Sequence, residues 1–287
     1  MAFYHQILFV FDTLQSDEKS HVDATERHHL KKNIDRFKGS FEYKCWTLPD
    51  AYEFTKQHYP FLTCIFDIET KYNIIKCDFF RYLLMYHFGG LYTDIDFLCI
   101  KPIHDFVQAI VSSALKNVDY RDETPCIVFT EEWHESMKLT QTIHNGFLYS
   151  QTSKHPFWIQ LIMEIYDQLI VKQIKINYES DVYEISGPKK LCSFYTRYKN
   201  TFDGIFVLPY YYCCPYIAIL KSTTNSGNSE TEPNTVTVLC NTSNALVPDL
   251  AKSVWVFFRM DHYDNINTLC PESFFVNVNL KSGSMWK

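Results

Sequence analysis

Long apolar runs are missing from this chain of 287 residues. The apolar stretch near the start, QILFVF at residues 6–11, is about half as long as a membrane-spanning helix and lacks the basic flank of a signal peptide. We therefore expect no integral membrane segment and a cytoplasmic location. The same stretch is predicted to form a buried first strand.

An excess of positive charge is also missing. The chain has 27 Lys and Arg against 33 Asp and Glu, which gives a net charge of -6. Nucleic-acid-binding domains normally carry a basic face, so we expect no nucleic acid among the partners.

Cysteine and histidine patterns that would bind zinc are absent as well. The 10 cysteines include no C-x-x-C pair, and the 11 histidines include no H-E-x-x-H spacing. Several cysteines lie inside apolar runs such as LTCIF at residues 62–66. This pattern predicts reduced, packed thiols rather than a disulfide framework or a zinc site.

Strand-like and helix-like segments alternate along the first part of the chain. Residues 6–11 and 41–48 have strand character, whereas residues 25–37 and 50–62 have helical character. This alternation favours an α/β fold. No internal repeat is present, so we expect a single domain over residues 1–287. Its polar stretch 221–247 is predicted to be a long mobile loop.

A helix followed by a strand is predicted in the middle of the chain. Apolar residues at 75, 79, 80, 83, 84 and 88 follow a helical period, and Gly89 with Gly90 then ends the helix. The next residues, LYTDIDF, alternate as a strand does. The alternation places Asp94 and Asp96 on the same side of that strand.

The D-x-D pair alone is weak support for a site, because chance predicts about one in a chain of this composition. A solvated turn is the simplest alternative. However, unpaired charge in a largely apolar segment is costly, so two carboxylates there indicate a site for Mg²⁺ or Mn²⁺. An EF-hand is excluded because Leu98 and Cys99 follow where oxygen ligands would be needed.

A second charged pair lies on the predicted helix. Asp78 and Arg81 are three residues apart and share a face with Tyr82. Taken alone, they are explained by an intrahelical ion pair worth a few tenths of a kcal/mol. Together with Asp94 and Asp96, they indicate a functional site.

The segment KCDFFRYLLMYHFGGLYTDIDFLCIKPI resembles the signature of the DXD-containing sugar transferases called glycosyltransferase family 32, which includes the initiating α-1,6-mannosyltransferases. It is also similar to the core of the clostridial glucosylating toxins. Eight positions over 19 residues match the family spacing, namely Asp78, Arg81, Tyr82, Gly89, Gly90, Tyr92, Asp94 and Asp96.

The resemblance implies a GT-A fold, which is a Rossmann-like mixed sheet flanked by helices. It also implies a nucleotide-sugar donor, with a UDP-sugar favoured and GDP-mannose as the other choice. By the resemblance, Asp96 binds Mn²⁺ or Mg²⁺ directly and Asp94 contacts the metal or the ribose. Asp78 and Arg81 would hold hydroxyls of the donor sugar, with Tyr82, Gly90 and Tyr92 on the donor side.

Shorter stretches extend the resemblance. Asn145 and Gly146 are similar to a family segment near the acceptor, and SGP at 186–188 is similar to a Thr-Gly-Pro turn. Phe9 or Phe11 stands where the family often has a tryptophan that stacks on the base. The C-terminal tail departs from the family by lacking its histidine pair. There the resemblance implies Ser284 as a metal ligand and Trp286 as a contact to the diphosphate or sugar.

By this resemblance, the chain is expected to be a metal-dependent retaining glycosyltransferase that moves a hexose to a hydroxyl on a glycan or protein. No residue can be assigned as a nucleophile, so the resemblance implies a front-face substitution. Two alternatives remain open. One is a catalytically silent module that binds a nucleotide sugar. The other is a metal-dependent phosphohydrolase, which would need ligands for a second ion.

Overall fold

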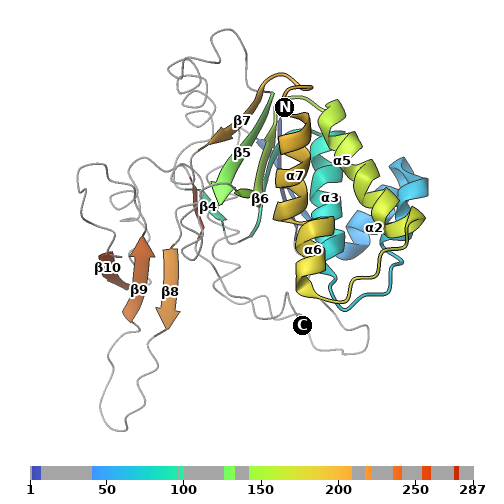
Figure 1. Cartoon of the computed structure of the whole chain (residues 1–287). Helices are drawn as coiled ribbons and strands as arrows, with labels where there is room; N and C mark the ends of the chain where they lie inside the picture. The colour runs from blue at the N-terminus through green and yellow to red at the C-terminus, as the bar shows by residue number, and fades with distance from the viewer. Residues whose placement is uncertain are drawn as a thin grey trace.

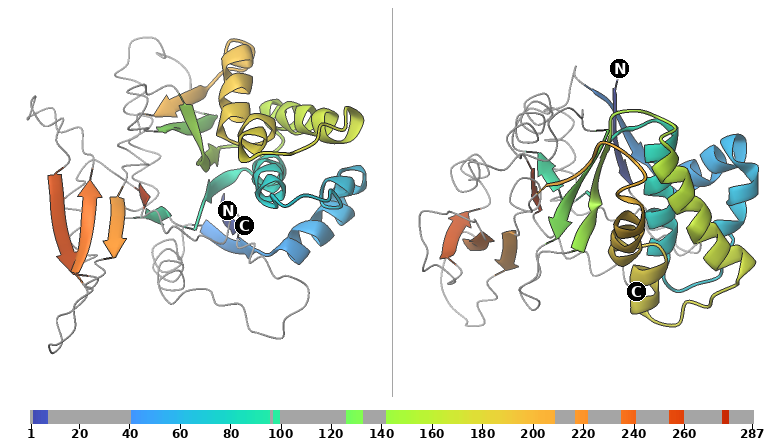
Figure 2. Two further views of the ribbon diagram at one scale, coloured as in Figure 1. Left: turned by 60° about the horizontal axis from the view of Figure 1, so that its bottom comes forward. Right: turned by 45° about the horizontal axis from the view of Figure 1, so that its top comes forward.

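The computed structural model describes residues 2–7, 41–95, 97–99, 126–132, 142–208, 217–221, 235–240, 254–259 and 275–277. Its centre is a six-stranded sheet, and the helices lie together on one side of that sheet (Figures 1 and 2).

The central sheet is mixed. Its strand order is β2-β1-β3-β6-β5-β7, in which β1 runs parallel to β2 and β3, β6 runs antiparallel to β3 and β5, and β7 runs parallel to β5. The strands are β1 (Ala2–Ile7), β2 (Phe41–Trp46), β3 (Gly90–Thr93), β5 (Ile127–Glu132), β6 (Thr142–Ser150) and β7 (Ile205–Leu208). The predicted α/β class, with a mixed sheet flanked by helices as expected of a GT-A fold, is confirmed.

The helices are amphipathic except for one that is buried on nearly all sides. They are α2 (Leu48–His58), the 3₁₀ turn η1 (Pro60–Ile65), α3 (Ile74–His87), α5 (Pro156–Tyr166), the π-helical turn η2 (Asp167–Val171), α6 (Glu179–Ile185) and α7 (Pro188–Tyr198). Every residue of α3 from Cys77 to Met85 is buried, because the helix packs against both β3 and α5. The charged pair predicted on this helix therefore lies inside the protein.

Two glycines join α3 to β3. Gly89 and Gly90 have φ angles of +66° and +81°, which lie in the left-handed region that side chains disfavour. A Cβ atom on Gly90 would lie 2.2 Å from the carbonyl oxygen of Phe3 on β1. The predicted helix stop is confirmed, and close strand pairing requires glycine at position 90.

The prediction of one continuous strand through residues 91–97 is wrong. β3 ends at Thr93, and a turn follows in which the Phe97 amide donates to the Asp94 carbonyl at 3.1 Å. The chain then enters β4 (Phe97–Cys99), which pairs with β11 (Phe275–Asn277) in a separate two-stranded sheet. Asp96 lies outside the described residues, so the predicted common side of the two carboxylates stays a prediction.

The loop predicted at 221–247 contains a strand. β9 (Thr235–Cys240) pairs antiparallel with β8 (Ile217–Lys221) and β10 (Val254–Arg259). The loop prediction is therefore wrong for residues 235–240, where TVTVLC alternates as a strand does. The single-domain assignment stays a prediction, and the helix expected at 25–37 lies outside the described residues.

Two further predictions concern membrane spans and thiols. Within the described parts of the chain, no helix has the length and apolar character needed to cross a membrane. Six cysteines of those parts are free thiols, as the sequence predicts, and they are Cys45, Cys64, Cys77, Cys99, Cys126 and Cys192.

Candidate functional site

The first element of the site is a buried ion pair on α3. Arg81 Nη2 lies 3.2 Å from Asp78 Oδ1, and the two side chains are 3% and 5% exposed. The spacing of three residues places both groups on one helix face, as predicted. Because charges out of water need partners, the surroundings of this pair decide what it can do.

Arg81 connects α3 to two strands. Its Nη1 lies 3.1 Å from Asp94 Oδ1, just after β3, and donates to the backbone carbonyl of Asn145 on β6 at 2.9 Å. The guanidinium carbon also lies 5.0 Å from the centre of the Tyr92 ring. Arg81 thus joins α3 to the end of β3, which is close in the sequence, and to β6, where its partner is 64 residues away.

Asp78 has hydrogen-bond partners on both carboxylate oxygens. Asn145 Nδ2 donates to Oδ1 at 2.9 Å, and the Ser186 hydroxyl donates to Oδ2 at 2.9 Å. The Tyr82 hydroxyl donates to the Ser186 carbonyl at 2.8 Å, which fixes the turn between α6 and α7. Burial raises the pKa of Asp78 to about 6, although Arg81, Ser186 and Asn145 act in the opposite direction.

Only one carboxylate oxygen of Asp94 has partners among the described residues. Its Oδ1 accepts from the Tyr92 hydroxyl at 2.5 Å and faces Arg81, whereas we find no hydrogen-bond partner for Oδ2 among the described residues. The side chain is 29% exposed. A Cβ atom on Gly146 would lie 2.3 Å from Oδ2, so the missing side chain at Gly146 leaves room for this oxygen.

The backbone around Asp94 is held by polar side chains of neighbouring strands. Gln6 Nε2 donates to the Asp94 carbonyl and to Thr93 Oγ1, both at 3.1 Å. The Tyr43 hydroxyl donates to Gln6 Oε1 at 3.2 Å, and the Asp94 amide donates to the Gly146 carbonyl at 2.8 Å. The position of the Asp94 carboxylate is therefore set by the sheet.

Hydrogen bonds and close contacts bring most of the described candidate residues together. Asp78, Arg81, Tyr82, Tyr92, Asp94, Asn145 and Gly146 form one connected cluster. Gly90 lies at the other end of β3, about 10 Å from Thr93 at the usual rise of a strand. Its predicted donor contact stays a prediction. The candidates Phe9, Phe11, Asp96, Ser284 and Trp286 lie outside the described residues.

Sequence patterns missed two members of this cluster. Gln6 is a lone amide at the start of the apolar run QILFVF, and this position was the available signal, since the structure buries the side chain completely. Ser186 lies in the SGP turn, which the resemblance marked, but its bond to Asp78 spans 108 residues. Sequence spacing carries no information about such a long-range contact.

Two observations show what the site lacks. The Nε atom of Arg81 is buried and has no hydrogen-bond partner among the described residues, which is costly for a charged group. The part of the chain that is described contains no group of three or more His, Cys, Asp and Glu side chains that could hold a metal. Asp94 offers one open carboxylate oxygen, which fits a hard divalent cation. The other predicted ligands, Asp96 and Ser284, lie outside the described residues.

A family model matches residues 13–114, a range that contains Asp78, Arg81 and Asp94. The description of that family is "Glycosyltransferase sugar-binding region containing DXD motif". The resemblance to DXD-containing sugar transferases is confirmed. Of the cluster around Arg81, the residues on α3 and at β3 lie within the matched range, whereas Asn145 and Gly146 lie beyond it.

Two proteins with sequences similar to this chain are mannosyltransferases. Inositol phosphoceramide mannosyltransferase 1 of Schizosaccharomyces pombe is 26% identical over 141 residues, which are 49% of this chain and 35% of the relative. The initiation-specific alpha-1,6-mannosyltransferase of Candida albicans is 47% identical over 36 residues, or 12% of this chain and 9% of the relative. The matches thus span about a third or less of these relatives.

The chain also aligns with a solved structure, at low sequence identity. The PaToxG glycosyltransferase aligns with 70% of this chain and 70% of its own chain, at a TM-score of 0.39 and 12% sequence identity.

Proposed function

We propose that this chain is a metal-dependent, retaining glycosyltransferase that moves a hexose from a nucleotide sugar to a hydroxyl group. One observation carries the proposal. Arg81 lies within 3.2 Å of Asp78 and 3.1 Å of Asp94, so the two halves of the DXD-family signature form a single site.

The donor we favour is a nucleotide-linked mannose. The sequence alone favours a UDP-sugar, but both named relatives are mannosyltransferases, so GDP-mannose becomes the first donor to test. The acceptor is a hydroxyl on a glycan, a protein or an inositol-containing ceramide lipid, since one relative is an inositol phosphoceramide mannosyltransferase. We propose that the reaction takes place in the cytoplasm.

The transfer breaks the bond from C1 of the sugar to a diphosphate oxygen and forms a bond from C1 to the acceptor oxygen. The acceptor proton passes to the departing diphosphate. A divalent cation bound by Asp94, Asp96 and Ser284 would stabilise the diphosphate as a Lewis acid. Configuration at C1 is retained because attack and departure occur on the same face.

Side chains of the site would favour this step by holding the reacting groups in fixed positions. Arg81 and the Tyr92 hydroxyl fix Asp94 Oδ1, so that Oδ2 points to the space that Gly146 leaves. Asp78 holds Arg81 from the other side, and both residues would contact hydroxyls of the donor sugar, as the family resemblance implies. Fixed donors and charges lower the barrier because they need no reorganisation during the reaction.

A panel of UDP- and GDP-hexoses with and without Mn²⁺ tests the proposal by thermal shift. Binding at 100 times Kd stabilises a protein by about 2.7 kcal/mol, which is readily measured. Release of nucleoside diphosphate then reports turnover, and we expect Asp96→Asn to abolish it. Unchanged turnover in that variant would contradict metal-dependent transfer. Donor binding without turnover would instead identify a silent sugar-nucleotide module.

A further inference from the structure

His144 lies beside the open oxygen of Asp94, and the transfer reaction proposed above gives it no role. A Cβ atom on Gly146 would lie 2.3 Å from Asp94 Oδ2 and 2.5 Å from His144 Cε1. The edge of the imidazole ring and the open carboxylate oxygen therefore line the same small space. A ligand held at Asp94 Oδ2 would lie next to the ring.

An irregularity in the pairing of β5 with β6 brings His144 to this place. Phe129 on β5 is paired with Leu148, but the next residue, Thr130, is paired with His144. Residues 145–147 of β6 therefore bulge out of the ladder with β5. Bulges redirect side chains and are over-represented next to active sites.

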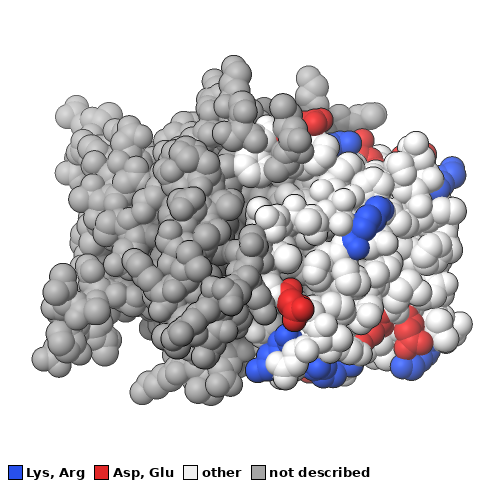
Figure 3. All heavy atoms as spheres, turned by 90° about the horizontal axis from the view of Figure 1, so that it is seen from above, with Lys and Arg blue, Asp and Glu red and all other residues white. Residues whose placement is uncertain are grey.

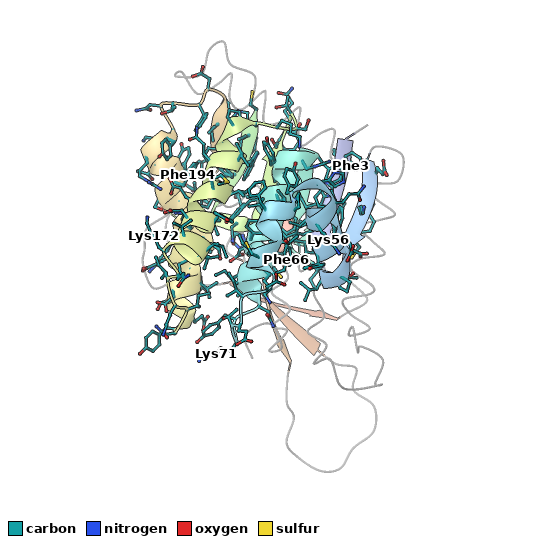
Figure 4. All side chains as sticks on the ribbon, turned by 90° about the vertical axis from the view of Figure 1, so that its right-hand side faces the viewer. Phe3, Lys56, Phe66, Lys71, Lys172 and Phe194 are labelled. Atoms are coloured by element: carbon teal, nitrogen blue, oxygen red, sulfur yellow. The ribbon has the colours of Figure 1, made fainter. Side chains whose placement is uncertain are left out.

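Neighbouring side chains of β6 serve different parts of the molecule at this bulge. Asn145 donates to Asp78 on α3 and so belongs to the helical layer, which faces the viewer with its side chains in Figure 4. His144 instead contacts the buried ring of Phe97 on β4, at 5.4 Å between ring centres and an angle of 70°. The ring of His144 is thus held against the strand that follows Asp94.

The backbone also determines which ring nitrogen of His144 carries the proton. The Gly146 amide donates to His144 Nδ1 at 2.8 Å. Because a backbone N–H can only donate, Nδ1 is the acceptor and the proton of the neutral ring lies on Nε2. We find no hydrogen-bond partner for Nε2 among the described residues. This nitrogen is therefore a donor, and it cannot ligate a metal while it carries the proton.

Overall charge does not explain how the chain would attract an anionic donor. Figure 3 shows both signs of charge scattered over the described surface at the top of the molecule. The chain as a whole has a net charge of -6. Binding of a nucleoside diphosphate therefore depends on individual groups that are placed to meet its oxygens.

We propose that the Nε2–H group of His144 donates a hydrogen bond to the diphosphate of the nucleotide sugar. This inference rests on the proposed transfer reaction and adds a residue to it. As the bond from C1 to the diphosphate oxygen breaks, the electron pair and the negative charge pass to the diphosphate. A fixed N–H donor stabilises that charge. His144 keeps its proton throughout, since the acceptor proton passes to the diphosphate.

Calorimetric titration of the full chain with GDP and UDP, each with Mn²⁺, tests this proposal without turnover. His144→Phe keeps a ring beside Phe97 and removes the N–H, so affinity for the diphosphate that the wild type binds should fall by about tenfold or more. Affinity for the matching nucleotide sugar should fall by the same factor, because the sugar is not contacted. His144→Gln loses the ring but restores an N–H donor, and it should recover most of the affinity.

His155 provides the matched control. It is also half-buried, and its Nδ1 also accepts from the amide two residues later, that of Phe157, at 3.2 Å. It precedes α5, beyond the other end of β6. His155→Phe should therefore bind nucleoside diphosphate as the wild type does. Equal losses in His144→Phe and His155→Phe would overturn the proposal, because the loss of any such contact would then explain the effect.

Binding of Mn²⁺ to the protein alone, measured by electron paramagnetic resonance, separates a hydrogen-bond donor from a metal ligand. We expect His144→Phe to bind Mn²⁺ as tightly as the wild type does. Weaker Mn²⁺ binding would overturn the proposal and make His144 a ligand. In turnover, kcat of His144→Phe should fall by about 10², the usual effect of removing one donor to a developing negative charge.

Three other results would overturn the proposal while the transfer reaction stands. They are wild-type affinity for nucleoside diphosphate in His144→Phe, a loss confined to the intact nucleotide sugar, and better binding by the Phe variant than by the Gln variant. A wild type that binds no nucleoside diphosphate with Mn²⁺ would instead overturn the transfer reaction itself.

Nitrogen NMR of the wild-type histidines keeps the proposal testable if the variants do not fold. The His144 signals should show the proton on Nε2 and should shift when the nucleoside diphosphate binds. Signals that do not change at saturating diphosphate would overturn the proposal.

Discussion

The two carboxylates that contact Arg81 differ in how many of their oxygen atoms have partners within the protein. Asp78 is 5% exposed and has partners on both oxygens, whereas Asp94 is 29% exposed and has partners on one. A buried carboxylate needs its full set of partners, because an unpaired one costs several kcal/mol. The comparison indicates that Asp78 fixes the geometry and that Asp94 offers an oxygen to a ligand.

The largest effect is expected at the open carboxylate. Asp94→Asn removes its charge and replaces one acceptor oxygen with a donor amide. We expect turnover of the nucleotide sugar to fall by about 10²–10³, the usual result of losing a group that stabilises the leaving group. The measurement is kcat/KM from release of nucleoside diphosphate. Near wild-type kcat/KM would show that the comparison assigns the wrong role to Asp94.

The next effect concerns the space beside Asp94. Gly146→Ala places a methyl group where Asp94 Oδ2 now lies, at 2.3 Å. We expect the carboxylate to move and activity to fall by about 10², with a stability cost of about 1–3 kcal/mol for overpacking. The measurements are kcat/KM and urea unfolding of the same preparation.

Gly90→Ala provides the contrast to Gly146→Ala. The clash there is with the Phe3 backbone at the other end of β3. We expect it to reduce stability by at least a similar amount, because φ is also unfavourable, with no specific loss of metal-dependent donor binding. Equal losses of donor binding in both variants would contradict a local role for Gly146.

A smaller effect is expected at the closed carboxylate. Ser186→Ala removes the donor to Asp78 Oδ2 and leaves that buried oxygen without a partner, at a cost of about 1–3 kcal/mol in unfolding free energy. Ser193→Ala is a matched control, because the exposed Ser193 hydroxyl donates to the Lys190 carbonyl within α7 at 3.0 Å. It should cost less than about 1 kcal/mol. Equal costs would show that Asp78 does not depend on Ser186.

The smallest effect is a dependence on pH. Burial raises the pKa of Asp78 to about 6, so donor affinity should fall by up to about tenfold per pH unit below that value, as protonation weakens the contact with Arg81. A raised pKa also means that Asp78 favours the folded state at a pH below the ordinary Asp value, and that this contribution is lost as pH rises through about 6. Calorimetric titration of the donor from pH 5 to 8 measures the affinity, and a flat profile would contradict the assignment.

Local patterns in the sequence predicted the parts of the site that are close in the chain. The helical period and the glycine pair located α3 and β3, and the spacing of Asp78 and Arg81 predicted their contact. The turn after Thr93 was missed because the alternation of apolar and polar residues continues through it. β9 was missed because it lies within a polar stretch that reads as a loop.

The partners of these residues could not be predicted. Asn145 and Ser186 contact Asp78 across 67 and 108 residues, and their positions depend on how β6 and α6 pack against α3. The resemblance placed Asn145 on the acceptor side, whereas the structure shows it bonded to both Asp78 and Arg81. Its acceptor role stays a prediction.

Calorimetric titration of GDP-mannose and UDP-glucose with and without Mn²⁺ shows whether Asp94 couples metal binding to donor binding. We expect Mn²⁺ to tighten binding of one of these donors to the wild type and to have no effect on its binding to Asp94→Asn. The same Mn²⁺ dependence in both proteins would contradict this coupling.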